Sequence, residues 1–375
     1  MKAKSVLIIS GHLGNSKRKA SIHFIAENMA LLGYKTYFLT IGLSQISHFK
    51  ADDERVGQLP HFPQNNWFAI APNMQNFIWY SLFHPFNLKN KWLNFFSVPI
   101  FALYPLFLPR IVLEVARQTD LIVIESGLGI LLAPRLKKIN PNATFIYTAS
   151  DRLSTLQTHP MLEKTLQQCL PWFGLVRVPA QSMLGDFKPA KTVHIPHGID
   201  KKLFDTQHPN PYPGKLNAIS IGNMLYDEFT IATLAKNLPN VTFHLFGKGV
   251  ATHKNYANVV VHGEKPFAQL VPYIQHASFG IAPYKMSESA DYLSQSSLKM
   301  IQYTYCRLPI VAPAFAAAGR PHVCAYQPNN ATSIIAAGKQ ALAYPRQNIS
   351  TKQVLSWQES THMMLKNAKK TKKKS

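Results

Sequence analysis

The sequence predicts an α/β fold of two facing Rossmann-like domains with parallel sheets, and three observations lead to this prediction. Short apolar, β-prone runs alternate with segments that can form helices, once between residues 6 and 178 and again between 218 and 312, as parallel doubly wound sheets require. A polar, proline-rich stretch at 205–214 separates the two series and is typical of a linker. The chain of 375 residues is long enough for two domains of common size.

The expected strands follow one another in order along each domain. Those of the N-terminal domain, taken as residues 1–205, are 6–9, 36–39, 121–124, 145–147 and 175–178. Those of the C-terminal domain, taken as 206–345, are 218–221, 242–246, 259–261, 279–281 and 310–312. Because open α/β sheets bind ligands beyond the carboxyl ends of their strands, residues directly after these runs are the first candidates for a site.

The chain is strongly basic and poor in cysteine. Its 40 Lys and Arg residues against 18 Asp and Glu give a formal net charge of +22, which favours a polyanionic partner such as nucleic acid or an anionic membrane. No base-stacking platform or nucleic-acid motif is evident in the sequence, so we expect a membrane rather than nucleic acid. Three widely spaced cysteines suggest neither a disulfide framework nor a zinc cluster and favour a reducing compartment.

Both ends of the chain carry positive charge. The apolar run that follows Met1 is too short for a secretion signal and reads as the first strand, so no secretion is expected. The lysine-rich end, residues 366–375, lacks the apolar residues needed for a core and is expected to be disordered. It could lie on anionic lipid or serve only solubility, and the sequence leaves both open.

The most hydrophobic run, residues 92–109, lies between the basic residues Lys89, Lys91 and Arg110. Its length nearly admits a transmembrane helix, but three prolines within it argue against one, since each removes a helix hydrogen bond. An aromatic, apolar segment with basic flanks fits an interfacial position at a membrane. The other interpretation is a helix and loop buried against the first domain.

Asp151 is the most informative residue of the N-terminal half. It follows the expected strand 145–147 within the sequence Ala149-Ser150-Asp151, where a carboxylate can act as a general base on a bound ligand. The alternative is a helix N-cap, because Asp and Ser side chains satisfy free backbone N–H groups there.

A second candidate site lies in the C-terminal half, at Ser296-Ser297-Leu298-Lys299. It reads as a serine-capped helix with a lysine in its first turn. Free N–H groups, two hydroxyls and a cation would then converge, which suits an anion such as phosphate. Taken alone, the same residues also fit an ordinary helix start with a solvated lysine.

The order and spacing of several motifs resemble the xanthan-type glucuronosyltransferases of glycosyltransferase family 70. The resemblance covers nearly the whole chain and rests most on 149–155, His197-Gly-Ile-Asp200 and 296–302, with support from 222–227, 247–249, Gly263-Glu264 and 282–284. It implies the glycosyltransferase B architecture, with a C-terminal segment, 346–375, that crosses back to the first domain near Trp357. The N-terminal domain would then bind the acceptor and the C-terminal domain the nucleotide sugar.

The resemblance further implies inverting transfer of glucuronic acid from UDP-glucuronate to a polyprenyl-diphosphate-linked oligosaccharide in exopolysaccharide biosynthesis, at the cytoplasmic face of the inner membrane. Asp151 would be the catalytic base. The positions that match the donor side are Met224, Glu264, Tyr284, Ser296, Ser297, Lys299 and Gln302. No Asp-x-Asp triplet occurs, so no metal is expected and backbone N–H groups, serines and cations would stabilise the leaving diphosphate.

Several assignments stay open at this stage. Lys299 could pair with the sugar carboxylate or with phosphate, Glu264 could accept from ribose hydroxyls, and Tyr284 could pack on the nucleotide or in the core. Lys265 departs from the family pattern, which puts the uracil contacts in doubt.

His12 and His84 could line the acceptor side. Other functions compatible with the sequence are a transferase for UDP-glucose or a UDP-N-acetylhexosamine and a non-enzymatic basic protein bound to membranes.

Overall fold

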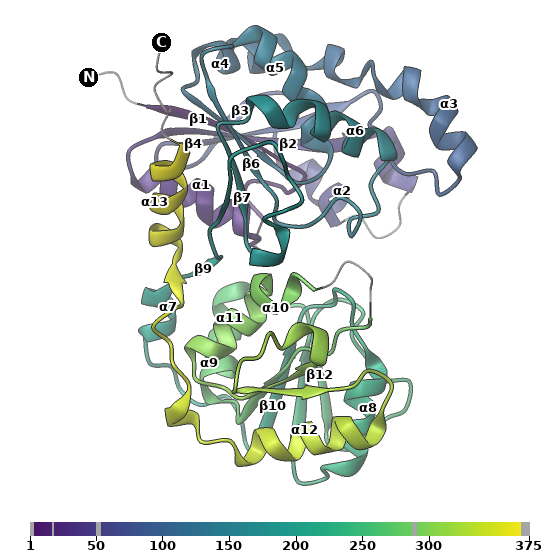
Figure 1. The fold of residues 1–375 in the computed structure, drawn as a ribbon, viewed down its shortest axis with the longest axis vertical. Coiled ribbons are helices and arrows are strands. Elements are labelled where there is room, and N and C mark those ends of the chain that lie inside the picture. Colours follow the sequence, from purple (N-terminus) through teal and green to yellow (C-terminus); the bar gives the residue numbers. More distant parts are fainter. Residues whose placement is uncertain (1–3, 17–18, 50–53, 287–290, 369–375) are drawn as a thin grey trace. The chain divides into compact units, whose positions relative to one another are not determined.

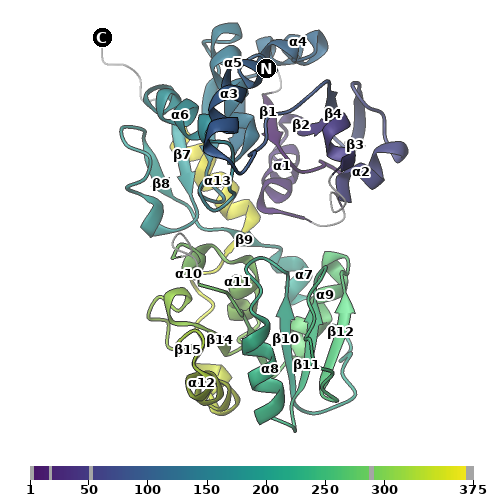
Figure 2. The ribbon, with the colours of Figure 1, turned by 90° about the vertical axis from the view of Figure 1, so that its right-hand side faces the viewer.

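A computed structural model of the chain describes residues 4–16, 19–49, 54–286 and 291–368. The chain forms two compact units, each with its own sheet (Figures 1 and 2). Residues 1–195 and 360–375 make the first unit, and residues 196–359 make the second. The lysine-rich end beyond residue 368 lies outside the described residues. The predicted α/β class with two parallel sheets is confirmed.

The first unit contains an eight-stranded sheet in which neighbouring strands run parallel, except for one antiparallel pair at its edge, β3 and β4. The central strands are buried and rich in branched and aromatic residues, as a sheet covered on both faces requires. In spatial order they are β3 (Trp67–Ala71), β4 (Met74–Ser81), β2 (Lys35–Ser44), β1 (Ser5–Ser10), β5 (Leu121–Glu125), β6 (Thr144–Thr148), β7 (Leu175–Val178) and β8 (Thr192–His194).

Helices connect most of these strands, and loops or short 3-10 turns lie between the end of each strand and the helix that follows it. They are α1 (Ser21–Leu31), α2 (Glu54–Gln58), α3 (Lys91–Phe101), α4 (Arg110–Gln118), α5 (Ala133–Ile139) and α6 (Pro160–Cys169). The last helix, α13 (Trp357–Ala368), begins in the second unit and continues into the first. There, the Nζ of Lys191 donates a hydrogen bond to the carbonyl of Asn367 at 2.6 Å and holds the end of the helix.

The second unit contains a six-stranded, fully parallel sheet. A core cluster of this unit packs apolar residues of the helices α8 and α12 against residues of β11, β13 and β15. The strands in spatial order are β12 (Val259–Gly263), β11 (Thr242–Phe246), β10 (Asn217–Ile221), β13 (Phe279–Ile281), β14 (Ile310–Pro313) and β15 (Val323–Tyr326). The helices are α7 (Lys201–Asp205), α8 (Glu228–Asn237), α9 (Phe267–His276), α10 (Leu293–Ser296), α11 (Leu298–Tyr305) and α12 (Ala331–Ala343).

A small two-stranded sheet in the second unit joins segments that are far apart in the sequence. Here β9 (Gly198–Ile199) pairs in parallel with β16 (Leu355–Ser356). A Cβ atom at Gly198 would lie 2.4 Å from the backbone of Ser356, so only glycine allows this approach. This pairing ties the start of the second unit to its end.

Candidate functional site

Three glycines line the carboxyl-end edge of the second sheet. Gly222 follows β10, Gly247 follows β11 and Gly263 ends β12, and all three have positive φ angles (80°, 146° and 69°). A Cβ atom at Gly247 would lie 3.2 Å from the carbonyl carbon of Gly222, so the first two turns pack backbone against backbone. Because glycine has no side chain, the backbone is accessible at these strand ends. This is where a phosphate-bearing ligand approaches an α/β sheet.

The predicted serine cap is present at the start of α11. The hydroxyl of Ser297 accepts a hydrogen bond from the Met300 amide and caps the helix, while Ser296 is the buried last residue of α10. The phenol of Tyr284, which is also buried, lies 2.6 Å from the Ser297 hydroxyl. Tyr284 therefore contributes to this site through its hydroxyl and packs in the core with its ring.

Lys299 lies in the first turn of α11 and is partly buried. Its Nζ atom is 4.8 Å from the centre of the Tyr284 ring and 3.9 Å from where a Cβ of Gly222 would lie. Burial lowers the pKa of its ammonium group to about 7. Among the described residues no carboxylate pairs with this ammonium group. A partly buried cation beside a glycine turn, without an acidic partner, fits an anionic ligand.

The other predicted donor-side residues lie along the same edge. Met224 is exposed in the turn after Gly222, and this turn is held by a hydrogen bond from the side-chain Nδ2 of Asn223 to the Lys248 carbonyl at 3.0 Å. Glu264 is exposed directly after β12, and Gln302 is partly buried one turn into α11. Tyr284, Ser297 and Lys299 contact one another at the start of α11, and Met224, Glu264 and Gln302 lie along the same edge.

Two features of this edge were not expected from the sequence. Arg320 is a second, partly buried cation near Tyr284, and its guanidinium bonds the carbonyls of Ala316 and Ala317. In the sequence, Arg320 is a single arginine that follows a glycine beyond β14, and nothing there indicates that it lies near Tyr284. The second feature is the pair His244 and His262, whose rings are joined by a 2.9 Å hydrogen bond behind the Gly263 turn.

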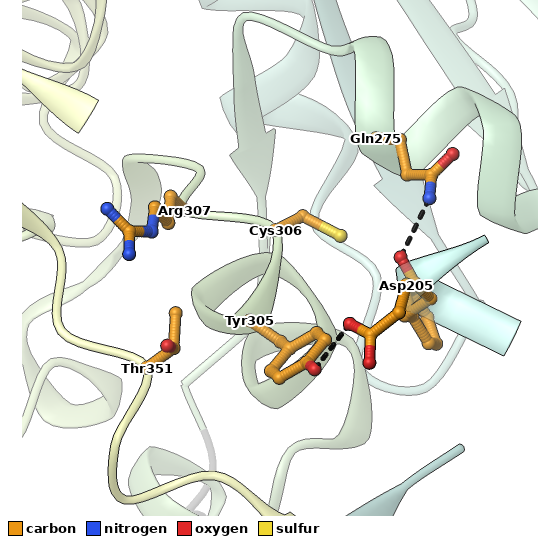
Figure 3. Close-up of a pocket in the computed structure, with 7 residues that line it drawn as sticks. Asp205, Gln275, Tyr305, Cys306, Arg307 and Thr351 are labelled. Atoms are coloured by element: carbon orange, nitrogen blue, oxygen red, sulfur yellow. Dashed lines mark hydrogen bonds between the residues drawn. The ribbon is translucent and has the colours of Figure 1, made fainter. Parts of the chain in front are cut away.

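A separate cavity of about 280 Å³ lies near the opposite, C-terminal end of α11 (Figure 3). Tyr305 donates a hydrogen bond to Asp205 at 2.6 Å across it, and Gln275 donates to the Phe204 carbonyl at 2.8 Å. The cavity is not built from the strand ends and shares no residue with the glycine turns.

In the first unit, Asp151 lies three residues beyond the end of β6. Its amide donates a hydrogen bond to the Ser126 hydroxyl at 3.1 Å, which ties it to the end of β5. It lines a cavity of about 360 Å³ together with Tyr147, Leu153 and Phe187. A carboxylate beside a cavity near the carboxyl ends of parallel strands could act as a general base on a ligand bound there.

The structure contradicts the alternative that Asp151 caps a helix. The next helix, α6, begins only at Pro160, and its cap is His159, whose ring accepts from the Met161 amide. Proline suits the first helical position because its missing N–H would be unpaired there. Arg152 instead fixes the intervening loop through an ion pair with Asp186 at 2.8 Å.

The two histidines considered for the acceptor side occupy different environments. His84 is buried and its ring bonds the Ser44 hydroxyl at 2.8 Å, so it packs inside the unit. His12 is exposed, and its Nε2 lies 3.9 Å from the carboxylate of Glu125, whose neighbour Ser126 holds the Asp151 amide. His12 therefore lies near the residue that holds the Asp151 loop.

The hydrophobic run 92–109 is largely exposed, which contradicts the buried alternative. Within α3, Asn94 and Phe101 alone are buried, whereas the exposed fractions of Trp92, Phe95 and Phe96 are 62%, 67% and 68%. We call the exposed side chains of this run and its continuation the apolar face; its other members are Leu93, Val98, Ile100, Leu103, Leu106, Phe107 and Ile111. In the described part of the chain, no single helix is long and apolar enough to cross a membrane, although residues 91–107 and 110–118 reach that length as a pair bent by 69°.

Within the described ranges, no group of three or more His, Cys, Asp or Glu side chains could hold a metal ion.

Comparison with known proteins identifies the family. Residues 8–179 match the family described as glucuronosyltransferase GumK, N-terminal domain. The chain is 34% identical over 361 residues to the UDP-glucuronate:glycolipid 2-beta-glucuronosyltransferase of Xanthomonas campestris pv. campestris, covering 96% of this chain and 88% of the relative.

Solved structures show the same fold at low sequence identity. A glycosyltransferase from Rickettsia africae has a TM-score of 0.61 at 14% identity, with both chains covered completely. The α,α-trehalose 6-phosphate synthase of Burkholderia multivorans has a TM-score of 0.62 at 9% identity, with 98% of each chain covered. The fold is the glycosyltransferase B fold, and the chain belongs to the family of GumK-type glucuronosyltransferases.

Proposed function

We propose that this glycosyltransferase moves glucuronic acid from UDP-glucuronate to a hydroxyl group of a polyprenyl-diphosphate-linked oligosaccharide, with inversion at the anomeric carbon, in exopolysaccharide biosynthesis. The relative that is 34% identical is named for UDP-glucuronate as donor and a glycolipid as acceptor. The observation that carries the proposal is Lys299, a partly buried cation without a carboxylate partner among the described residues, beside the Gly222 turn.

The second unit supplies the donor side. The Gly222 and Gly247 turns let the diphosphate approach the backbone, and Ser297 and Lys299 offer a hydroxyl and a cation at the start of α11. Lys299 would meet the sugar carboxylate, with Arg320 as a further positive charge near Tyr284. Glu264 would accept hydrogen bonds from the ribose. The donor site would be completed by Met224, Tyr284, Ser296 and Gln302. Backbone N–H groups and cations then stabilise the leaving diphosphate without a metal.

The first unit supplies the base. As the acceptor oxygen forms its bond to the anomeric carbon, the bond from that carbon to the phosphate oxygen breaks and its electron pair leaves with UDP. The hydroxyl proton passes to the carboxylate of Asp151. Proton transfer to a positioned carboxylate contributes about 10²–10⁴ to the rate.

The apolar face supports a peripheral position on the cytoplasmic side of the inner membrane, where a polyprenyl-linked acceptor would be. Aromatic side chains that are more than 60% exposed are costly in water and favourable at a bilayer interface. Lys89, Lys91 and Arg110 flank the face, and their charge favours anionic lipid. No nucleic-acid partner is proposed.

A thermal-shift panel with UDP, UDP-glucose and UDP-glucuronate tests the donor. A ligand that binds only the folded protein raises Tm, and more so the tighter it binds. We expect UDP-glucuronate to raise Tm most. A larger shift with UDP-glucose would favour a neutral-sugar transferase, and no shift with any of the three would favour a membrane-binding protein without this activity.

A further inference from the structure

The edge strand β12 of the second sheet has one residue more than its partner β11 where the two reach the donor side. Between the pairs Leu245–Val261 and Phe246–Gly263, β12 contains the additional residue His262, which forms a β-bulge. Bulges bend a strand, change the direction of the residues that follow and often lie next to active sites. His262 is therefore placed directly before the turn that contains the proposed ribose contact.

The ring of His262 packs among aromatic side chains. It stacks on the ring of Phe246, with 4.3 Å between the ring centres and 4° between the planes. The ring of Tyr273 on α9 lies 5.2 Å away in an edge-to-face arrangement, and Tyr273 also contacts Phe246 at 4.8 Å. Such ring pairs stabilise a structure beyond the area that they bury. The bulge is thus fixed by its side chain as well as by its backbone.

A directional chain of hydrogen bonds runs from His262 into the sheet. Asn217, at the start of β10, donates through Nδ2 to the Gly214 carbonyl at 2.8 Å, so its Oδ1 is left as an acceptor. The Nε2 of His244 lies 3.1 Å from this oxygen and therefore donates to it. The Nδ1 of His244 then accepts from the Nε2 of His262 at 2.9 Å. Burial lowers the pKa of both rings, that of His244 to about 4, so both are neutral at neutral pH.

The bulge is also joined to the neighbouring donor turns. The Gly247 amide donates a hydrogen bond to the Gly263 carbonyl at 2.8 Å. Gly247 in turn packs against the backbone of Gly222. Displacement of the bulge would therefore reach the diphosphate side of the donor site as well as the ribose side.

We propose that His262 is a positioning residue for donor binding: through the bulge and its bond to His244, it holds Glu264 where this carboxylate accepts from the ribose hydroxyls. Glu264 is exposed, so its position depends on the backbone of the turn. A side chain that is already in the binding geometry loses less freedom when the ligand arrives, and binding is tighter. This inference rests on the proposed contact of Glu264 with the ribose.

The test compares the affinity for UDP with that for 2′-deoxy-UDP, both measured by calorimetry. The analogue lacks one ribose hydroxyl, and a hydrogen bond to a charged group contributes about tenfold to affinity. We expect the wild-type protein to prefer UDP by this factor. His262→Ala should bind the two nucleotides about equally, as Glu264→Ala should. Damage to the diphosphate side or to the fold weakens both nucleotides alike, so it leaves the ratio of the two affinities unchanged.

Three further variants sharpen the comparison. His262→Gln should recover part of the preference, because its side-chain amide can donate in place of Nε2. His276→Ala removes another histidine of the same unit, one that bonds the His208 carbonyl at the end of α9, and it should keep the wild-type ratio. If His262→Ala does not fold, His244→Phe takes its place, since it keeps a ring but cannot accept from His262.

The outcomes separate this inference from the proposed function. A wild-type ratio in His262→Ala, or in His244→Phe where that variant replaces it, overturns the inference if Glu264→Ala has lost the preference. An equal loss in His276→Ala overturns it as well, because any disturbance of the unit would then have the same effect. If Glu264→Ala keeps the wild-type ratio, the ribose contact is contradicted and the inference with it. Absence of UDP release from UDP-glucuronate by the wild-type protein would instead contradict the proposed function.

Discussion

The ring of His159 lies 3.0 Å from the hydroxyl of Ser97, and this hydrogen bond joins α3, which carries most of the apolar face, to the end of the Asp151 loop. His159 also bonds the Asn94 carbonyl at 3.1 Å, and Asn87 donates to the Gln157 carbonyl at 2.9 Å. Polar contacts within the first unit thus join α3 to the end of the loop that begins at Asp151.

Replacing His159 should therefore reduce transfer without removing membrane binding. His159→Leu loses the cap of α6, which costs roughly 1 kcal/mol, and releases the loop from α3. We expect kcat/KM for the acceptor to fall about tenfold while sedimentation with vesicles is unchanged. Ser97→Ala is the control, because His159 keeps its bond to Asn94. Wild-type transfer by His159→Leu would show that this contact does not position the loop.

Asp151→Asn tests the base directly. The amide has nearly the same shape but cannot take a proton at neutral pH, so transfer should fall by about 10²–10⁴. The thermal shift with UDP-glucuronate should stay at the wild-type value, since the substitution lies in the other unit from the donor residues. Near-normal turnover would remove Asp151 from this role.

Membrane binding should depend on the exposed aromatic residues of α3. Each such side chain contributes roughly 1.5–3 kcal/mol when fully buried, so replacing Trp92, Phe95 and Phe96 with serine should abolish sedimentation with anionic vesicles. Phe101 is left in place because it is buried and its loss would destabilise the fold. Phe229→Ser changes an exposed aromatic residue of the second unit and serves as the control. Equal binding by the triple variant and this control would exclude the apolar face as the docking surface.

Donor binding should weaken as the pH rises above 7. Burial lowers the pKa of Lys299 to about 7, so at higher pH the free protein carries a neutral amine, and an anionic ligand must bind together with a proton. Well above pH 7, the affinity for UDP-glucuronate should then decrease by a factor that approaches ten for each pH unit. Calorimetry at pH 8 in buffers of different ionisation enthalpy measures the proton uptake. Lys299→Arg, which stays charged, should bind without taking up a proton; the same uptake in that variant would point to another group.

Much of the fold could be predicted because each buried parallel strand leaves a local apolar run. All ten expected strands are present; they are β1, β2, β5, β6, β7 and β10 to β14. The β3–β4 hairpin was missed, although Asn73, with a φ of 59°, marks its turn. The sequence favoured an interfacial position for 92–109 but left a buried one open, because an apolar run alone does not reveal whether another element covers it.

Candidate site residues could be proposed from the sequence where one segment contains them, and not where the fold brings them together. Ser297 and Lys299 follow from a local capping pattern, which the structure confirms for Ser297. Glu125 looks like the last residue of a strand in the sequence, and only the pairing of β1 with β5 places it beside Ser10. Arg320 likewise reaches Tyr284 only through the arrangement of the second sheet.

The most direct test of the central claim is the donor preference of Lys299→Ala. If Lys299 meets the sugar carboxylate, the variant should lose turnover of UDP-glucuronate far more than affinity for UDP, because the lost ion pair belongs to the sugar. Its preference for UDP-glucuronate over UDP-glucose should narrow accordingly. An equal loss of affinity for UDP and for both UDP-sugars would place Lys299 on the diphosphate and contradict glucuronate recognition at this residue.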